Sequence, residues 1–288
     1  MNAPLNDSAL IGRLTDAATA IRRIAIAAIY HATSGHPGGA LSCADLFACI
    51  YGAALRGGND LTRDRFVLSK GHGAPALYAT GAQFGLCSIK EALSLRKLGS
   101  KFQGHPHVRD LPWVETSTGS LGQGFSVAIG MALGLKMKKS GARIYAMLGD
   151  GELQEGEVWE GAMCAAHHKL DNLVAVIDYN KLQSDDSNAN IMGLEPLGDK
   201  WRAFGWHVQE IDGHNIALIL DALDKAAAAA GKPHVIIAHT VKGRGVPYME
   251  NVPAWHGSVK MTPQQTEDAL RALDVAEADL KHWMEGNV

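Results

Sequence analysis

The sequence has little of what disordered, fibrous or nucleic-acid-binding proteins require. Of its 288 residues 47% are hydrophobic and 20% are charged, which excludes an intrinsically disordered chain and a coiled coil. Lysine and arginine number 27 against 30 acidic residues, and this net charge of −3 provides no basic surface for a nucleic-acid backbone. Runs of about 18 apolar residues are missing, so the sequence predicts no membrane-spanning helix.

Cysteine is scarce as well, and a targeting segment is not apparent. The four cysteines form neither a CxxC pair nor a zinc-like spacing, so we interpret them as buried, reduced thiols: Cys43, Cys49, Cys87 and Cys164. Residues 1–7 do not show the basic and then apolar pattern of a signal peptide. We therefore expect a cytoplasmic protein.

Strand and helix patterns alternate along the chain. Short apolar runs predict strands over residues 65–68, 143–148, 173–178, 206–211 and 234–241. Helical periodicity predicts helices over residues 9–32, 43–54, 88–97, 122–139, 155–169 and 215–230, with a last helix opening at a capping box in 262–265. Strands separated by helices of this length indicate an α/β fold, a parallel sheet with helices on both faces. No linker divides the sequence, so we expect one domain over residues 1–288.

Glycine is abundant: 32 of the 288 residues are glycine, which is about 11% against a usual share of about 7%. Four glycine-bearing loops precede predicted helices, at residues 34–39, 70–73, 117–124 and 149–151. Such a turn before a helix is suited to anion binding, because free backbone N–H groups and the helix dipole point at the ligand. The chain has no GxxxxGK[ST] pattern and no well-placed dinucleotide fingerprint. A phosphate-bearing ligand other than a nucleotide is therefore expected.

Two polar side chains follow neighbouring predicted strands. Asp150 stands at the carboxyl end of one strand, and Asn180 stands at the end of the next strand thirty residues later. A right-handed crossover places such strands side by side or one strand apart, and adjacent strands lie about 4.8 Å apart. One carboxylate, one amide oxygen and the backbone carbonyl of Leu182 suit an octahedral Mg²⁺ that leaves positions for diphosphate oxygens. Alternatively, Asp150 only caps the next helix and Asn180 only forms a turn.

Several segments carry a resemblance to a known family. Gly149-Asp-Gly151, followed by Asn180, resembles the thiamine diphosphate motif. Further segments resemble transketolase and stand in transketolase order: 34–38, 63–69, 71–72, 104–106, 117–124, 149–156 and 255–257. The resemblance extends from about residue 10 to about residue 270. On this pattern the chain is identified as a member of the transketolase family, which implies the thiamine diphosphate-binding fold and a transketolase-type transferase of carbohydrate metabolism.

The resemblance also implies a cofactor site. Asp150, Asn180 and the Leu182 carbonyl match the ligands of a divalent cation, Mg²⁺ or else Ca²⁺ or Mn²⁺, that holds the diphosphate. The residues that match cofactor-binding positions are Gly119, Ser120, Leu121, Gly149, Asp150, Gly151, Glu155, Asn180, His72 and His256. Glu155 and Glu160 match acidic residues of a subunit interface, where the equivalent of Glu155 belongs to a network that links two cofactors.

Four histidines match catalytic positions: His36, His72, His105 and His256. By resemblance, His72 and His256 lie near the diphosphate and the thiazolium ring, whereas His36 and His105 face sugar hydroxyls. Imidazole suits this role, because transfer of a ketol unit moves protons to and from hydroxyl oxygens near neutral pH.

Relatives of full length carry a diphosphate-binding, a pyrimidine-binding and a C-terminal domain, and the chain resembles only the first. We therefore expect one subunit of a split transketolase, active with a second chain that carries the other domains, in an α2β2 assembly. The expected reaction transfers a two-carbon ketol unit from a ketose to an aldose. Two alternatives stay open: a subunit of another thiamine diphosphate enzyme such as a 2-oxoacid dehydrogenase, and a non-catalytic binding or regulatory subunit.

Overall fold

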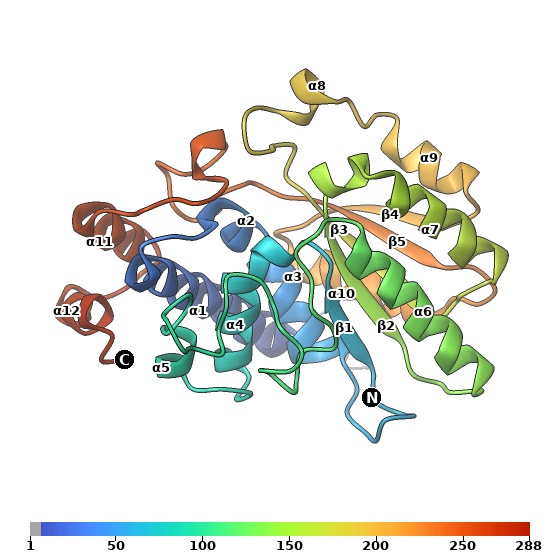
Figure 1. Ribbon diagram of the computed structural model, residues 1–288, viewed down its shortest axis with the longest axis horizontal. Helices are drawn as coiled ribbons and strands as arrows, with labels where there is room; N and C mark the ends of the chain where they lie inside the picture. The colour runs from blue at the N-terminus through green and yellow to red at the C-terminus, as the bar shows by residue number, and fades with distance from the viewer. Residues whose placement is uncertain (1–6) are drawn as a thin grey trace.

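The computed structural model describes residues 7–288, and a parallel β-sheet lies at its centre (Figure 1). The prediction about a signal peptide rests largely on residues 1–6, which lie outside the described residues. Over residues 7–288 the sheet has five strands in the order β1-β2-β3-β5-β4. Their bounds are β1 Arg65–Leu68, β2 Ile144–Gly149, β3 Leu173–Tyr179, β4 His207–Asp212 and β5 His234–His239. All pairs are parallel, and every predicted strand is present within two residues of its expected ends.

Helices cover both faces of the sheet, as predicted. Along β2 the side chains of Ile144 and Ala146 pack into one apolar core, and those of Tyr145 and Met147 pack into the other. The first core also includes residues of α6 (Gln123–Met137), α7 (Gly156–His167) and α9 (Leu197–Ala203). The second includes residues of α1 (Ser8–Ala32), α3 (Ala44–Cys49), α4 (Ala74–Gln83) and α10 (Ile216–Ala228). Because strand side chains alternate between faces, both faces of β2 are buried.

Two predicted helices differ from the structure. The helix expected over 43–54 is α3 followed by a π-helical segment, Ile50–Ala54. The helix expected over 88–97 is only α5, Ile89–Ala92, although its capping box between Ser88 and Glu91 is present. The chain turns after Ala92 because Arg96 has a left-handed backbone (φ +57°) and donates its N–H to the carbonyl of Phe102. A non-glycine residue in that conformation ends a helix.

The remaining elements are short segments and a C-terminal helix pair. They are α2 Pro37–Ser42, η2 Gly71–Gly73, η3 Gly151–Gln154, α8 Asn188–Ile191, η4 Pro253–Trp255, α11 Pro263–Ala272 and α12 Glu277–Glu285. The capping box that opens α11 is formed by Thr262 and Gln265, as the sequence predicts. Within the described chain, no helix has the length and apolar character needed to cross a lipid bilayer.

The cysteines are free thiols, as expected, but they are not all buried. Cys43 and Cys49 are buried in the core around α1, and Cys87 is half-buried. Cys164 is exposed, because the inward side of α7 is taken by Val158, Ala162 and other small residues. The prediction of burial was therefore wrong for Cys164.

Candidate active site

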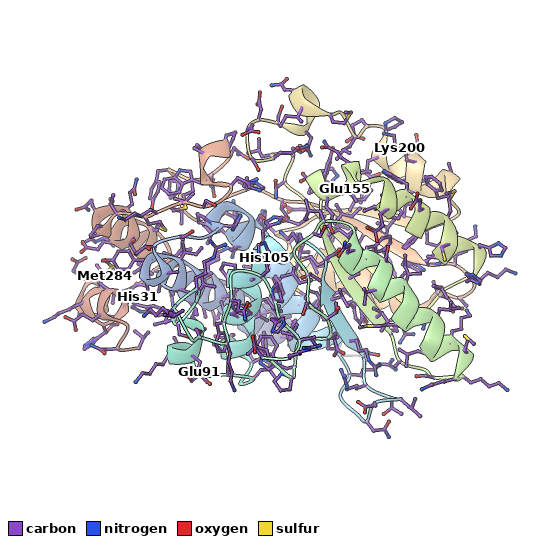
Figure 2. The ribbon with its side chains drawn as sticks, in the orientation of Figure 1. His31, Glu91, His105, Glu155, Lys200 and Met284 are labelled. Carbon is purple, nitrogen blue, oxygen red and sulfur yellow. The ribbon has the colours of Figure 1, made fainter. Side chains whose placement is uncertain are left out.

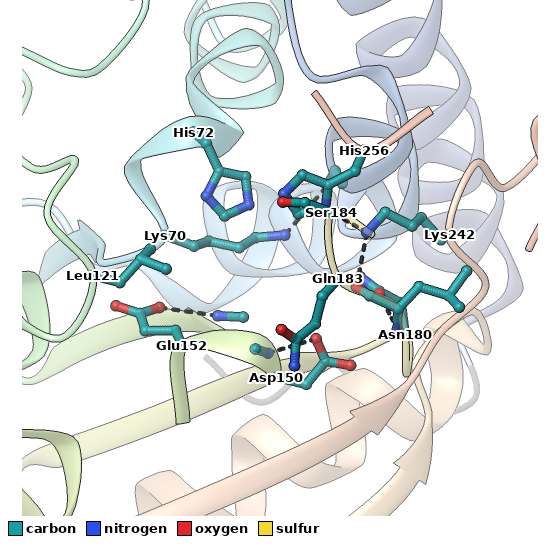
Figure 3. A pocket seen from close by; sticks show the side chains of 14 residues that line it. Lys70, His72, Leu121, Asp150, Glu152, Asn180, Gln183, Ser184, Lys242 and His256 are labelled. Atoms are coloured by element: carbon teal, nitrogen blue, oxygen red, sulfur yellow. Dashed lines mark hydrogen bonds between the residues drawn. The ribbon is translucent and has the colours of Figure 1, made fainter. Parts of the chain in front are cut away.

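A cavity lies where the carboxyl ends of β2 and β3 meet the loops that follow β1 and β5 (Figure 3). Its lining includes predicted site residues from several of these segments: His72, Leu121, Gly149, Asp150, Gly151, Asn180, Leu182 and His256. The glycine loops therefore meet in space, in a lining that runs from Gly39 to His256 along the chain. In an open parallel sheet, this end of the strands is where ligands bind.

The three predicted metal ligands lie together. β2 and β3 are neighbours, with Gly149 paired to Asp178, so the chain after each strand emerges side by side. Asp150 accepts hydrogen bonds from the backbone N–H of Gly151 at 2.8 Å and from that of Lys181. The side-chain oxygen of Asn180 accepts from the N–H of Leu182 at 3.2 Å. A carboxylate, an amide oxygen and a backbone carbonyl thus border one cavity, and these are ligands that Mg²⁺ prefers.

Asp150 is buried, with 3% of its surface exposed. Burial raises the pKa of its carboxyl group above the usual range, and the nearby negative charge of Asp178 raises it further. A cation beside Asp150 would relieve both effects. The donor set therefore fits a divalent ion, although over residues 7–288 no cluster of three or more His, Cys, Asp or Glu side chains is gathered as a metal site.

Lys242 is a residue of this cavity that the sequence analysis did not single out. Its ammonium group is buried and donates to the carbonyl of Leu182 at 2.8 Å and to Nδ1 of His256 at 2.6 Å. Burial lowers the pKa of Lys242 from its ordinary value, while the carboxylate of Asp150 opposes that shift. The signal in the sequence is a lysine placed directly before a glycine in the loop after a predicted strand.

Three of the four predicted histidines form a cluster. The ring centroids of His36, His72 and His256 lie 5.3 to 5.9 Å apart. Burial, with nearby cations adding to it, lowers the pKa of His36 to about 4 and that of His256 to about 3. The pKa of His72 lies well below its ordinary value, again mainly because of burial. The three imidazoles are therefore neutral at pH 7 and can accept or donate a proton at a hydroxyl oxygen.

His105 lies at the edge of the cluster rather than within it. It is exposed and borders a separate hollow with Arg96. Its ring packs beside Gly119, where a side chain would come within 3.2 Å of the imidazole. This position suits contact with a ligand that extends outward from the cavity.

The loops that carry the predicted cofactor residues contact each other directly. A Cβ atom on Gly71 would lie 2.6 Å from the backbone nitrogen of Gly119, so these two loops can approach only because residue 71 is glycine. Leu121 lines the cavity. Ser120 and Glu155 are exposed and are not among the lining residues; Figure 2 shows Glu155 next to the start of α7. Their cofactor roles stay predictions.

Glu152 is a second residue that the sequence analysis missed. Its buried carboxylate accepts from the Ser69 hydroxyl at 2.5 Å, from the Gly122 N–H at 2.9 Å and from the Gly149 N–H at 3.0 Å. One side chain therefore ties together three of the loops that border the cavity. Gly122, at the N-terminal end of α6, has φ +87°, a conformation that favours glycine.

Comparison with known proteins shows the family. Residues 14–273 match the model of the transketolase thiamine diphosphate-binding domain. The chain is 43% identical over 261 residues to a 6-deoxy-6-sulfo-D-fructose transketolase subunit of Clostridium sp. strain MSTE9, covering 89% of this chain and 94% of that protein. It is 41% identical to an apulose-4-phosphate transketolase subunit of Phocaeicola vulgatus, covering 88% of this chain and 90% of that protein. The chain belongs to the transketolase family.

Solved structures agree with this assignment. The chain superposes on the transketolase of Campylobacter jejuni with a TM-score of 0.84 at 29% identity, covering 99% of this chain and 47% of that one. Human transketolase is 41% identical over 256 residues, and the chain covers 40% of its length. The chain therefore spans less than half of these transketolases and nearly all of the two subunits. The predicted family, the thiamine diphosphate-binding α/β fold and a transketolase-type transferase are confirmed.

Proposed function

We propose that this chain is the diphosphate-binding subunit of a thiamine diphosphate-dependent transketolase, which transfers a two-carbon ketol unit from a ketose to an aldose. The observation that supports the proposal best is that the three metal-ligand candidates line one cavity together with His72 and His256, two members of the cluster of neutral histidines. The alternatives of a 2-oxoacid dehydrogenase subunit or a non-catalytic chain are not favoured, because the family and these residues all agree with transketolase.

The residues of the cavity suit distinct tasks. Asp150, Asn180 and the Leu182 carbonyl would hold Mg²⁺, or Ca²⁺ or Mn²⁺, against the diphosphate. Bound thiamine diphosphate supplies the carbon nucleophile that carries the ketol unit. His36 packs behind the lining residues His72 and His256, and its buried Nδ1 atom has no partner in the described chain, so this nitrogen is free to form a hydrogen bond when a ligand binds.

We further propose that a partner chain supplies the pyrimidine-binding and C-terminal domains, and that two copies of each chain form an α2β2 enzyme. The two relatives that the chain covers nearly end to end are both named transketolase subunits. Glu155 and Glu160 lie exposed on the side of α7 and its entry, where a second copy can contact them. A cytoplasmic location suits the free cysteines.

The metal assignment is tested by Asp150→Ala on the assembled enzyme. We expect thiamine diphosphate affinity in the presence of Mg²⁺ to fall at least about 100-fold, because the only carboxylate of the donor set is lost. Asp185→Ala is the matched control, since Asp185 is an exposed acid of the loop that carries Asn180 and Leu182, and it does not line the cavity. Calorimetric titration measures both. Unchanged affinity in the Asp150 variant would contradict the assignment.

The partner is tested by assaying ketol transfer with the purified chain alone and with a co-expressed second subunit. We expect turnover only in the mixture. Light scattering should show a complex of higher mass, and thiamine diphosphate with Mg²⁺ should promote its assembly. Full turnover by the isolated chain would refute the need for a partner while leaving the metal assignment intact.

A further inference from the structure

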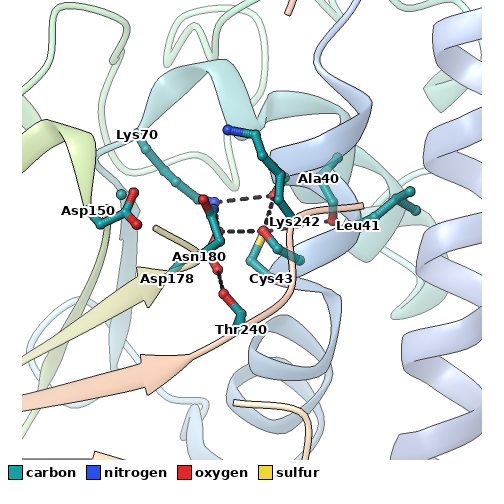
Figure 4. A network of polar contacts seen from close by, with 12 residues as sticks. Ala40, Leu41, Cys43, Lys70, Asp150, Asp178, Asn180, Thr240 and Lys242 are labelled. Atoms are coloured by element: carbon teal, nitrogen blue, oxygen red, sulfur yellow. Dashed lines mark hydrogen bonds and ion pairs between the residues drawn. The ribbon is translucent and has the colours of Figure 1, made fainter. Parts of the chain in front are cut away.

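A buried polar network lies directly beneath the proposed metal ligands, and Asp178 is at its centre (Figure 4). Asp178 is fully buried. One carboxylate oxygen accepts from Lys70 at 2.5 Å, from Ser42 at 2.6 Å and from the side-chain amide of Asn180 at 3.3 Å. The other oxygen accepts from the hydroxyl of Thr240 at 2.5 Å. Four segments around the cavity are therefore joined through one carboxylate.

The contact with Asn180 decides which end of its amide faces the cavity. The carboxylate oxygen that pairs with Lys70 acts as an acceptor, so the NH₂ group of Asn180 must face Asp178. Its oxygen then points to the opposite side, where it accepts from the N–H of Leu182. Turning the amide around would place oxygen against oxygen at Asp178 and donor against donor at Leu182. Both contacts specify the same orientation, and a metal ion binds the oxygen and not the NH₂ group.

Lys70 and Asp178 form an ion pair that is buried on both sides, with side-chain exposures of 1% and 0%. Lys70 is 1% exposed and also donates to the carbonyl of Gly39 at 3.2 Å. The pairing with a buried ammonium holds the carboxylate in place, so that it provides a fixed acceptor for Asn180.

We propose that Asp178 is a positioning residue of the cation site: its carboxylate, paired with Lys70, holds the Asn180 amide with the oxygen toward the metal. The inference rests on the proposed function, because it assigns a supporting role to a residue behind a proposed ligand. Residues behind metal ligands orient those ligands, and their loss typically weakens metal affinity about 10- to 100-fold.

The test compares Mn²⁺ affinity in variants of the full chain, in the assembly that performs ketol transfer and with thiamine diphosphate present. The variant is Lys70→Met with Asp178→Asn, which removes both buried charges together so that neither is left unpaired. We expect Mn²⁺ to bind about 10- to 100-fold more weakly, by electron paramagnetic resonance titration of the free ion. Thr240→Val is the matched control. It removes a donor to the other oxygen of Asp178, so we expect Mn²⁺ affinity within about twofold of wild type.

A double-mutant cycle with Asn180→Ala separates positioning from general stability. Once Asn180 is gone, the double substitution at Lys70 and Asp178 should lower Mn²⁺ affinity no further. An equal loss with and without Asn180 would show a merely structural role and overturn the proposal. The proposal would also be overturned if the Lys70 and Asp178 double variant bound Mn²⁺ with wild-type affinity while Asp150→Ala abolished binding. If Asp150→Ala binds Mn²⁺ normally, it is the proposed metal site that fails.

A second measurement does not depend on a variant that folds. Neutron diffraction on the wild-type, Mg²⁺-loaded assembly locates the amide hydrogens of Asn180. We expect both on the nitrogen that faces Asp178, with the oxygen toward the metal. An Asn180 amide whose NH₂ group is turned away from Asp178 would overturn the proposal.

Discussion

Two groups of ion pairs in this chain differ in where they lie, and their difference is instructive. Beneath the cavity, Lys70 and Asp178 pair with side-chain exposures of 1% and 0%. On the surface of α11 and α12, Arg271 pairs with Glu267, Asp268 and Glu277, with all four side chains at least 36% exposed. Each group has several charge-assisted hydrogen bonds. Water screens the surface group, whereas the buried group cannot be solvated when a partner is lost.

The comparison shows that the number of contacts does not measure their importance. The surface pairs are solvated when they separate, and none of their four residues lines the cavity. The buried pair gains little net stability over an apolar core, but it holds side chains in one arrangement. We therefore expect substitutions in the two groups to have effects of very different size.

The largest effect is expected for Lys70→Met. It leaves the carboxylate of Asp178 buried without its cation, and such an uncompensated charge costs about 3–5 kcal/mol of unfolding free energy. Adding Asp178→Asn should restore most of this loss, because no buried charge is then unpaired. Urea unfolding of the three proteins measures it. Equal stability of the single variant and wild type would show that water reaches Asp178.

The next effect concerns catalysis and the exposed histidine. His105→Ala should raise the KM for the ketose donor or lower kcat by about tenfold, with thiamine diphosphate affinity kept, because His105 borders a separate hollow and does not line the cavity. Steady-state kinetics and calorimetry measure the two quantities. His107→Ala, two residues along the same loop and paired with Asp110, is the control. A loss of cofactor affinity would instead place His105 within the cofactor site.

A smaller effect is expected from pH. The unfolded chain binds a proton at His256 below its ordinary pKa of 6.5, whereas in the folded chain burial, and then Lys242, lower that pKa to about 3. Stability is therefore full above pH 6.5 and declines as the pH falls from 6.5 toward 3. Between pH 7.5 and pH 5.5 we expect His256→Gln to lose about 1 kcal/mol less stability than wild type. Urea unfolding at both pH values measures this, and equal losses would contradict the shifted pKa.

The smallest effect is expected for the surface group. Arg271→Ala should leave the melting temperature within about 1 °C of wild type, because exposed pairs contribute little and salt screens them. Thermal unfolding at low and high salt provides the measurement. A clear, salt-dependent loss would mean that α11 and α12 rely on this group, and the contrast between the two groups would disappear.

Much of this architecture could be predicted from the sequence because the signals are local. Strand β2 is apolar throughout and ends at a glycine, and β3 is a second apolar run, so both strands and their parallel direction were predictable. Asp150 and Asn180 follow consecutive strands, which made their convergence predictable too. The end of α5 at Ala92 was not predictable from local signals. It depends on the left-handed backbone of Arg96 and on the hydrogen bond between Arg96 and Phe102, which lies ten residues after Ala92.

The residues that support the site could not be found in this way. In the sequence, Lys70 is an ordinary lysine before a glycine, and Glu152 is one of several acidic residues in its segment. Their burial follows from loops that meet only after folding. From sequence alone a charged side chain is predicted to be exposed, because burial of a charge requires a partner that the local sequence does not reveal.

By itself, the sequence determined the α/β class, the family, the glycine loops and the pair Asp150 and Asn180. Only the tertiary structure decided the strand order, in which β5 lies between β3 and β4. That order brings Thr240 and Lys242 beside Asp178 and the Leu182 carbonyl, where they complete the polar surroundings of the cavity. The physical reason is that periodicity and turn residues act over a few positions, whereas a buried charge finds its partners across the whole fold.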